Sequence, residues 1–272
     1  MTDTKREPIH GSIEKIIGEF VRNAGSELEA RWNAWELDMG QREFQEVAGG
    51  LMARQVTLAV QIARNPLIWN GDGAPVLLRA MADVYINLAW IFGAPAERSR
   101  KFVLHGLGQM KLHLEHRKAL RGEGPPDPQE EAYIKREEEW LQSQRIPDLT
   151  DVNLGSWAES NTRKMADEAG CLDFYNYVYM PFSGVTHSMW QHVGRNNMKE
   201  CLNPLHRPHR IPCVVDGGID PFYIHLAAKY LRKAFALFDE KTGVKVDVPS
   251  AYEVLEQRFE ELSDGEGEET RD

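Results

Sequence analysis

Cysteine is scarce in this chain of 272 residues, where it occurs three times, at Cys171, Cys201 and Cys213. So sparse and odd a set excludes the disulfide framework of a small secreted scaffold and favours a reducing compartment, the cytoplasm. Residues 1–10 are polar and lack the apolar stretch of a signal peptide, so we expect none. Basic residues are also few, 32 against 42 acidic ones, and the net charge is −10. That charge excludes a surface that binds nucleic acid or anionic membrane as a whole, so any such contact must be local.

Long apolar runs are missing as well. The most hydrophobic segment, residues 76–92, is marginal in length for a bilayer and contains Arg79 and Asp83. Each of these charges costs roughly 2.5–3.5 kcal/mol at the centre of a membrane. We therefore expect no membrane contact, and we interpret the segment as a helix buried within the protein.

Segments that alternate between apolar and polar residues are absent, so no strand is expected. Apolar residues instead recur at spacings of three and four, which is typical of amphipathic helices. This spacing, with caps and proline breaks, predicts helices over residues 9–35, 42–63, 76–92, 97–120, 158–168, 172–180, 182–192 and 221–239, and helices that begin near 127 and 250. Pro181 should break or kink the chain between two of them. We predict an all-α fold, a single multi-helix bundle over residues 1–263 with helix 76–92 at its centre, and a disordered acidic tail over 264–272.

The apolar segment carries one polar stripe. Arg79, Asp83 and Asn87 are spaced by four, so they share one side of a helix that is otherwise apolar all round. An unpaired charge in a central helix costs several kcal/mol, so Arg79 and Asp83 must be paired, hydrated, or both. Two interpretations remain open: an internal ion pair that fixes helix packing, or the wall of a pocket.

A second polar row lies about a hundred residues later, where Tyr179, Ser183 and His187 are also spaced by four. Histidine exchanges protons near neutral pH, serine and tyrosine orient a substrate, and an arginine stabilises developing negative charge. We therefore predict that Arg79 and His187 approach one another across a shared cleft. The candidate catalytic residues are Arg79, Asp83, Tyr179, Ser183 and His187. The alternative is a hydrogen-bonded histidine within an aromatic core.

A proline-rich loop over residues 203–212 holds a third group of polar side chains. His206, Arg207, His209 and Arg210 are candidates for contact with an anion such as phosphate, together with Asn87. Cys201 and Cys213 flank the same loop, and with the two histidines they offer four ligands that zinc uses. Their spacing matches no zinc-finger pattern, so we expect that no metal and no cofactor is required, although metal binding by these four residues stays open.

The segment Val76–Leu88, the row Tyr175-x3-Tyr179-x3-Ser183-x3-His187-x2-Trp190 and the later Asn203-Pro-Leu-His206-x2-His209 together resemble a prokaryotic family of helical proteins known only as a domain of unknown function, DUF5677. The resemblance covers roughly residues 48–238. It implies that the family's characteristic polar positions are Arg79, Ser183, His187, His206 and His209. It also implies a glutamate where this chain has Asp83, and gives no such role to Cys201 or Cys213. It suggests an intracellular bacterial protein linked to stress or phage defence.

Two classes of function follow. The first is an enzyme that cleaves a phosphodiester in RNA without a metal, because such cleavage needs acid–base groups and a cation near the phosphate. The second is a non-catalytic binding or regulatory module that holds a small anionic ligand or a protein partner. The partners expected are RNA or a small anion, with a second copy of the chain or a co-encoded protein as further candidates.

Overall fold

The structure is a computed structural model that describes residues 9–120, 127–144, 158, 160–215 and 217–269. Helices dominate it, so the predicted all-α class is confirmed. The longer helices are α1 (Ile9–Ala34), α2 (Arg42–Ala63), α3 (Ala74–Phe92), α4 (Pro95–Ala119), α5 (Pro128–Ser143), α10 (Phe222–Thr242) and α11 (Ala251–Glu269). The shorter ones are α6 (Thr162–Glu168), α7 (Leu172–Phe174), α8 (Met180–Thr186) and α9 (Trp190–Asn196), with a π-helix η3 (Tyr175–Tyr179) and the 3₁₀ turns η1 (Met39–Gln41), η2 (Pro66–Ile68) and η4 (Pro204–His206).

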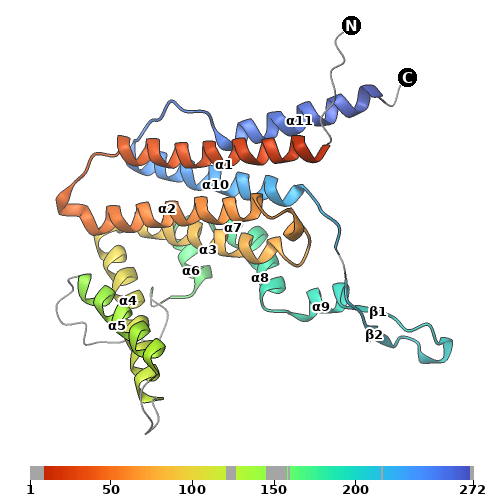
Figure 1. Ribbon diagram of the computed structural model, residues 1–272, viewed down its shortest axis with the longest axis horizontal. Coiled ribbons are helices and arrows are strands. Elements are labelled where there is room, and N and C mark those ends of the chain that lie inside the picture. The colour runs from red at the N-terminus through yellow and green to blue at the C-terminus, as the bar shows by residue number, and fades with distance from the viewer. Residues whose placement is uncertain (1–8, 121–126, 145–157, 159, 216, 270–272) are drawn as a thin grey trace.

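The helices stack in layers around α3 (Figure 1). Helix α1 packs on α11 and α2, while α10 packs on α2, α3 and α11. The opposite side of α3 is covered by α6, η3 and α8. Of the 19 residues of α3, 13 are buried, which confirms that the most apolar helix is the central one. It is the one helix among the described residues that is long and apolar enough to cross a membrane, yet 67% of its most apolar stretch of 18 residues is buried inside the protein.

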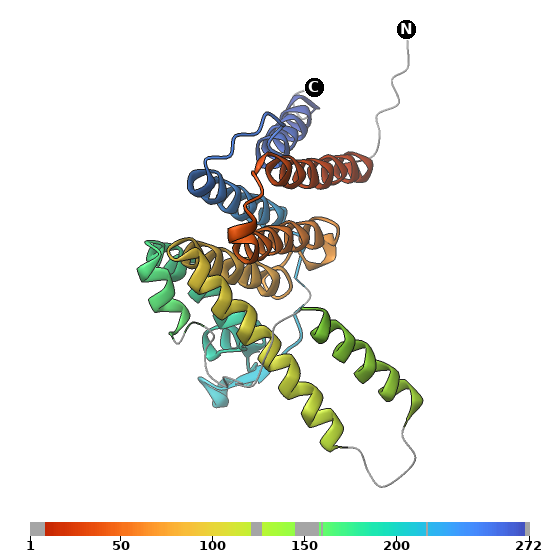
Figure 2. The same ribbon diagram turned by 90° about the vertical axis from the view of Figure 1, so that its left-hand side faces the viewer.

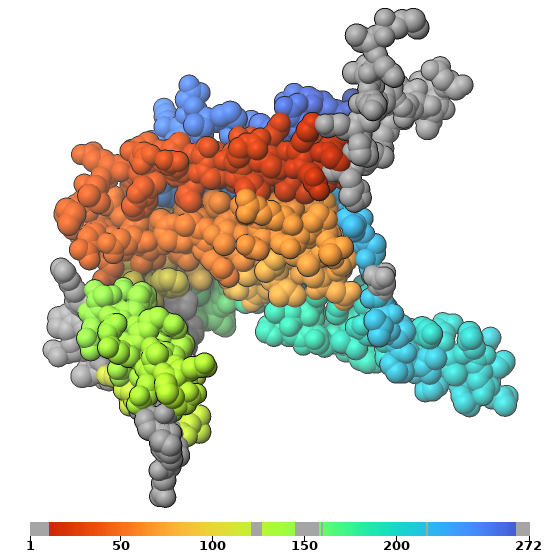
Figure 3. Space-filling view, in the orientation of Figure 1, coloured from red at the N-terminus to blue at the C-terminus, as the bar shows by residue number. Residues whose placement is uncertain are grey.

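Two parts extend from this body. Helices α4 and α5 form an arm that leaves the stacked layers (Figure 2). The second projection is a hairpin of β1 (Met198–Glu200) and β2 (Arg210–Pro212), which pair antiparallel with Glu200 opposite Arg210 (Figure 3). The expectation that no strand forms is therefore wrong at this hairpin. Its two short strands are both edges, and a proline is tolerated at such positions.

Three predicted boundaries differ from the structure. Pro181 does not break the chain, because the π-helix η3 runs directly into α8 and its wide turn accommodates the missing N–H of the proline. The break falls at Ser188, whose φ of 49° is left-handed, and it separates α8 from α9. Helix α6 begins at Thr162, because the Asn161 side chain caps the amide of Lys164. Helix α11 continues to Glu269, so it includes most of the tail expected to be disordered, and residues 270–272 lie outside the described residues.

A buried ionic network joins the outer helices. The Arg31 guanidinium donates from Nε and Nη2 to both carboxylate oxygens of Asp239 on α10, each at 2.8 Å. It also donates from Nη1 to Glu27 Oε1, one turn earlier on α1, at 3.2 Å. The second oxygen of Glu27 accepts the backbone N–H of Ala251, the first residue of α11, at 2.8 Å. Three helices that are distant in sequence are thus joined through one arginine, which also lies over the ring of Phe235.

Candidate active site

The two predicted polar rows meet at Arg79. Its Nε donates to Ser183 Oγ at 2.6 Å, and its Nη1 forms an ion pair with Asp83 one turn later on α3. The guanidinium carbon lies 3.2 Å from the centroid of the Tyr179 ring, a cation–π contact. The side chain of Arg79 is only 9% exposed, and Ser183 is buried as well. The sequence therefore predicted correctly that the polar row of α3 contacts the row that begins at Tyr179. We call Arg79, Asp83, Tyr179 and Ser183 the Arg79 cluster.

The π-helix η3 places Tyr179 beneath the guanidinium. Tyr175 and Tyr179 stack with ring centroids 4.7 Å apart, and the Tyr179 hydroxyl donates to Thr162 Oγ1 at 3.2 Å. A proline cannot donate a backbone hydrogen bond, so regular α-helical bonding cannot run through Pro181, and a wide turn just before it is one way to accommodate this. Thr162 was not predicted as a site residue. Nothing in the sequence marks it, because its contact with Tyr179 arises only when α6 and η3 pack on α3.

His187 lies at the edge of this cluster. It follows α8 directly, its backbone N–H donates to the Ser183 carbonyl at 3.0 Å, and its side chain is exposed. The charge of His187 acts on the carboxyl of Asp83, whose side chain is 43% exposed. Burial raises the pKa of the Asp83 carboxyl above its usual range, although the charge and hydrogen bond of Arg79 and, to a lesser extent, the charge of His187 act to lower it. Asp83 and His187 are thus the two proton-exchanging groups of this site that solvent reaches.

The arrangement differs from the predicted cleft. The guanidinium that was expected to face a ligand is held by Ser183, Asp83 and the Tyr179 ring. One hollow lies between α1 and α11 and another between the start of α10 and the middle of α11, and neither of these two contains a residue of the Arg79 cluster. The enclosed guanidinium therefore matches the structural alternative, whereas Asp83 and His187, at the outer edge of the site, are exposed to solvent.

The predicted ligand-binding residues do not join this cluster. Asn87 is half-buried on α3, one turn beyond Asp83, and forms no side-chain hydrogen bond with another described residue. His206, Arg207, His209 and Arg210 belong to the projecting hairpin (Figure 1). Arg210 is already engaged, because its Nη1 donates to the Gly194 carbonyl of α9 at 2.8 Å. The two groups of polar residues predicted from the sequence are therefore two separate features of the fold.

This geometry defines a helical protein with an arginine-centred polar junction on its central helix. The chain belongs to a family of unknown function, DUF5677, whose match covers residues 45–201. The expected resemblance is thereby confirmed, although the match ends at Cys201 and does not reach His206 or His209. No curated protein and no solved structure matches the chain.

Replacing Arg79 by alanine should lower the free energy of unfolding by roughly 2–3 kcal/mol, because it removes a charged hydrogen bond to buried Ser183 and the cation–π contact with Tyr179. The cost should stay below the 3–5 kcal/mol of a fully buried broken ion pair, because water reaches the half-exposed Asp83. Urea unfolding measures the difference. Arg54→Ala, at an exposed position of α2, is the matched control. A loss as small as that of the control would contradict the packing role of Arg79.

Proposed function

We propose that this protein is an enzyme whose reaction depends on proton transfer by Asp83 and His187, and that its substrate is a phosphodiester of RNA. The observation that supports it best is a half-exposed carboxylate, Asp83, that lies within reach of the charge of the exposed His187 imidazole. Proton exchange with a bound substrate requires acid–base groups that solvent reaches in this way. The buried Arg79 then acts as a positioning residue that holds Asp83 by an ion pair, with Ser183 and Tyr179 behind it.

RNA suits these groups because it carries its own nucleophile, the 2′-hydroxyl. In the proposed step the Asp83 carboxylate accepts the proton of the 2′-hydroxyl, whose oxygen forms a new bond to phosphorus. The bond from phosphorus to the 5′-oxygen breaks, and protonated His187 gives its proton to that leaving oxygen. The products are a 2′,3′-cyclic phosphate and a 5′-hydroxyl. The positive charge of His187 also stabilises the negative charge that develops on the phosphate in this step. Arg79 is enclosed and does not reach the phosphate.

A second candidate function is a binding or regulatory module that holds a small anion or a protein partner without turnover. One observation favours it: Arg79 is engaged on the inside of the protein, as in a packing element, so of the five predicted catalytic residues His187 is the cation that solvent reaches. For either function, the proposed setting is the bacterial cytoplasm, in stress or phage defence, with a second copy of the chain or a co-encoded protein as partner. This setting is proposed from the family resemblance and the composition.

The test uses a matched pair of oligonucleotides in buffer containing EDTA. The RNA strand is expected to be cut into fragments that end in a 2′,3′-cyclic phosphate and a 5′-hydroxyl, as identified by mass spectrometry. The same sequence with 2′-deoxyribose throughout should stay intact, because it lacks the nucleophile. If no RNA is cut, while an anion binds and its binding weakens in Arg79→Ala and His187→Ala, the binding module is the correct function.

A further inference from the structure

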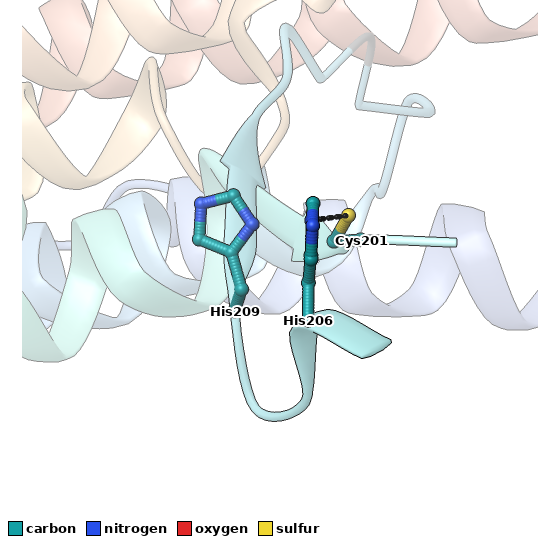
Figure 4. A group of neighbouring side chains, drawn as sticks. All are labelled: Cys201, His206 and His209. Atoms are coloured by element: carbon teal, nitrogen blue, oxygen red, sulfur yellow. Dashed lines mark hydrogen bonds between the residues drawn. The ribbon is translucent and has the colours of Figure 1, made fainter. Parts of the chain in front are cut away.

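The projecting hairpin brings three metal-binding side chains together at its tip (Figure 4). Glu200 pairs with Arg210 across the two strands, so the next residue, Cys201, lies opposite His209, and its backbone N–H donates to the His209 carbonyl at 3.1 Å. The 3₁₀ turn η4 returns the chain and places His206 beside both of them. The hairpin register therefore brings together ligands whose spacing in the sequence matches no zinc-finger pattern.

The separations suit a tetrahedral zinc ion. The ligand atoms of Cys201, His206 and His209 all lie within 4.8 Å of one another. Cys201 Sγ is 3.7 Å from His206 Nδ1. In a tetrahedral site with usual zinc–sulfur and zinc–nitrogen bonds, a sulfur and a nitrogen ligand are about 3.6 Å apart. The separation of Cys201 Sγ and His206 Nδ1 therefore already matches that of two ligands of one zinc ion. A small movement of the His209 ring would bring its nitrogen to the same ion.

Cys213, the fourth residue considered from the sequence, is not part of this group. Its backbone N–H donates to the Asn197 carbonyl at the far end of the hairpin. Asn197 is four residues from Cys201 along an extended strand, a separation of about 13 Å. The three ligands at the tip therefore leave one coordination position for a solvent molecule.

We propose that Cys201, His206 and His209 bind one zinc ion, whose fourth position holds an exchangeable water. One thiolate and two imidazoles are a typical ligand set for zinc. Binding displaces the thiol proton of Cys201 and uses both histidines in their neutral form, so affinity rises with pH. The site lies on the hairpin and is independent of the Arg79 cluster, so chelation leaves the proposed RNA cleavage unchanged.

Asn203 determines how readily His206 accepts the metal. Its Oδ1 accepts the backbone N–H of Leu205 at 3.0 Å, and its Nδ2 lies 3.1 Å from His206 Nε2. An amide N–H donates, so this contact requires a lone pair on Nε2 and leaves the imidazole proton on Nδ1, the atom nearest the thiol. Zinc at Nδ1 needs the opposite tautomer, with a proton on Nε2 that finds an acceptor. An aspartate at position 203 would accept both N–H groups and thereby favour the metal-binding tautomer.

The test is a zinc titration of metal-free full-length protein at pH 7.5, in competition with a chromophoric chelator. We expect one ion per chain, at least about tenfold weaker binding in Cys201→Ser and in His209→Ala, and no change in Cys213→Ser, the matched cysteine control. Asn203→Asp should tighten binding about tenfold, the effect of a carboxylate that accepts the free N–H of a metal-bound imidazole. Cobalt substitution should give a thiolate charge-transfer band that Cys201→Ser abolishes.

Circular dichroism of each variant keeps the result interpretable, since the hairpin lies outside the helical core and these changes should leave the helices intact. The proposal is overturned if Cys201→Ser binds zinc as tightly as the unmodified protein, if Cys213→Ser weakens binding equally, or if the stoichiometry does not reach one. Failure of RNA cleavage with normal zinc binding would count against the proposed function alone.

Discussion

His187→Ala is expected to reduce RNA cleavage by about 10²–10⁴-fold, the usual contribution of one general acid–base group. The melting temperature should hardly change. The reason is that the His187 side chain is exposed and forms no side-chain hydrogen bond with another described residue, so its removal costs little packing. Single-turnover cleavage of a labelled RNA and a thermal melt of the same preparation measure both quantities.

The control for this variant is His113→Ala, which removes another exposed histidine, from α4, a helix that contributes no residue to the Arg79 cluster. It should retain full activity. Asp83→Asn supplies a second readout, because loss of the carboxylate should remove the contribution of the base to the pH profile, whereas a residue that merely packs would leave the shape of that profile unchanged. Full activity in His187→Ala would exclude the acid–base mechanism.

Arg31→Ala is expected to have the largest effect on stability, a loss of about 3–5 kcal/mol in the free energy of unfolding. The substitution leaves the Glu27 carboxylate, which is 7% exposed, without its cation, and it separates α1 from Asp239 on α10. Among the described residues, the backbone N–H of Ala251 is then the one hydrogen-bond donor left to the Glu27 carboxylate. Chemical denaturation at pH 8 measures the loss.

The pH dependence of the stability loss shows whether Arg31→Ala acts through the unpaired buried charge of Glu27 or through lost packing. Burial already raises the pKa of the Glu27 carboxyl above its usual range, against the opposing hydrogen bond of Ala251 and the charge of Arg31. Without Arg31 that pKa rises further. A carboxyl whose pKa is higher in the folded state destabilises the fold as pH rises from its unfolded value through its folded value. The destabilisation should therefore be larger at pH 8 than at pH 5.

Arg258→Ala is the matched control for Arg31→Ala. Arg258 also joins α11 to α1, through Glu19, but its side chain is 43% exposed. Exposed ion pairs contribute little to stability. The control should therefore melt close to the unmodified protein at both pH values. Equal losses at pH 5 and pH 8 for Arg31→Ala would show that packing, and not the charge of Glu27, causes the effect.

The sequence predicted the parts of this fold that depend on local periodicity. The spacing of apolar residues located α1 to α3 almost to the residue, and the all-round apolarity of α3 predicted its central position. The same reasoning paired the stripe of Arg79 with the row of Ser183, because desolvated polar groups must find partners. It left the orientation of the guanidinium open, since an inward and an outward pair satisfy the same pattern.

The features that were missed depend on long-range contacts. Arg31 and Asp239 are 208 residues apart, and nothing in the local sequence of either marks them as partners. The hairpin at Cys201 and His209 escaped prediction because its strands are three residues long, too short for an alternating pattern to be detected. The open edge at Asp83 and His187 likewise depends on where α8 ends, which a positive φ at Ser188 determines.

The π-helix η3 has a consequence for how the length of this segment can vary. A π-helical turn accommodates one residue more than an α-helical turn over nearly the same distance. Deleting one residue from Tyr175–Val178 would let the turn close into an α-helix, with α8 in the same orientation, if Pro181 were also replaced by a residue that has a backbone N–H. Inserting a residue between Tyr179 and Ser183 would instead rotate Ser183 by about 100° around the helix axis, away from Arg79. Relatives that retain the Arg79 cluster are thus expected to lose a residue in η3 only where the proline is also replaced, and not to gain residues in α8.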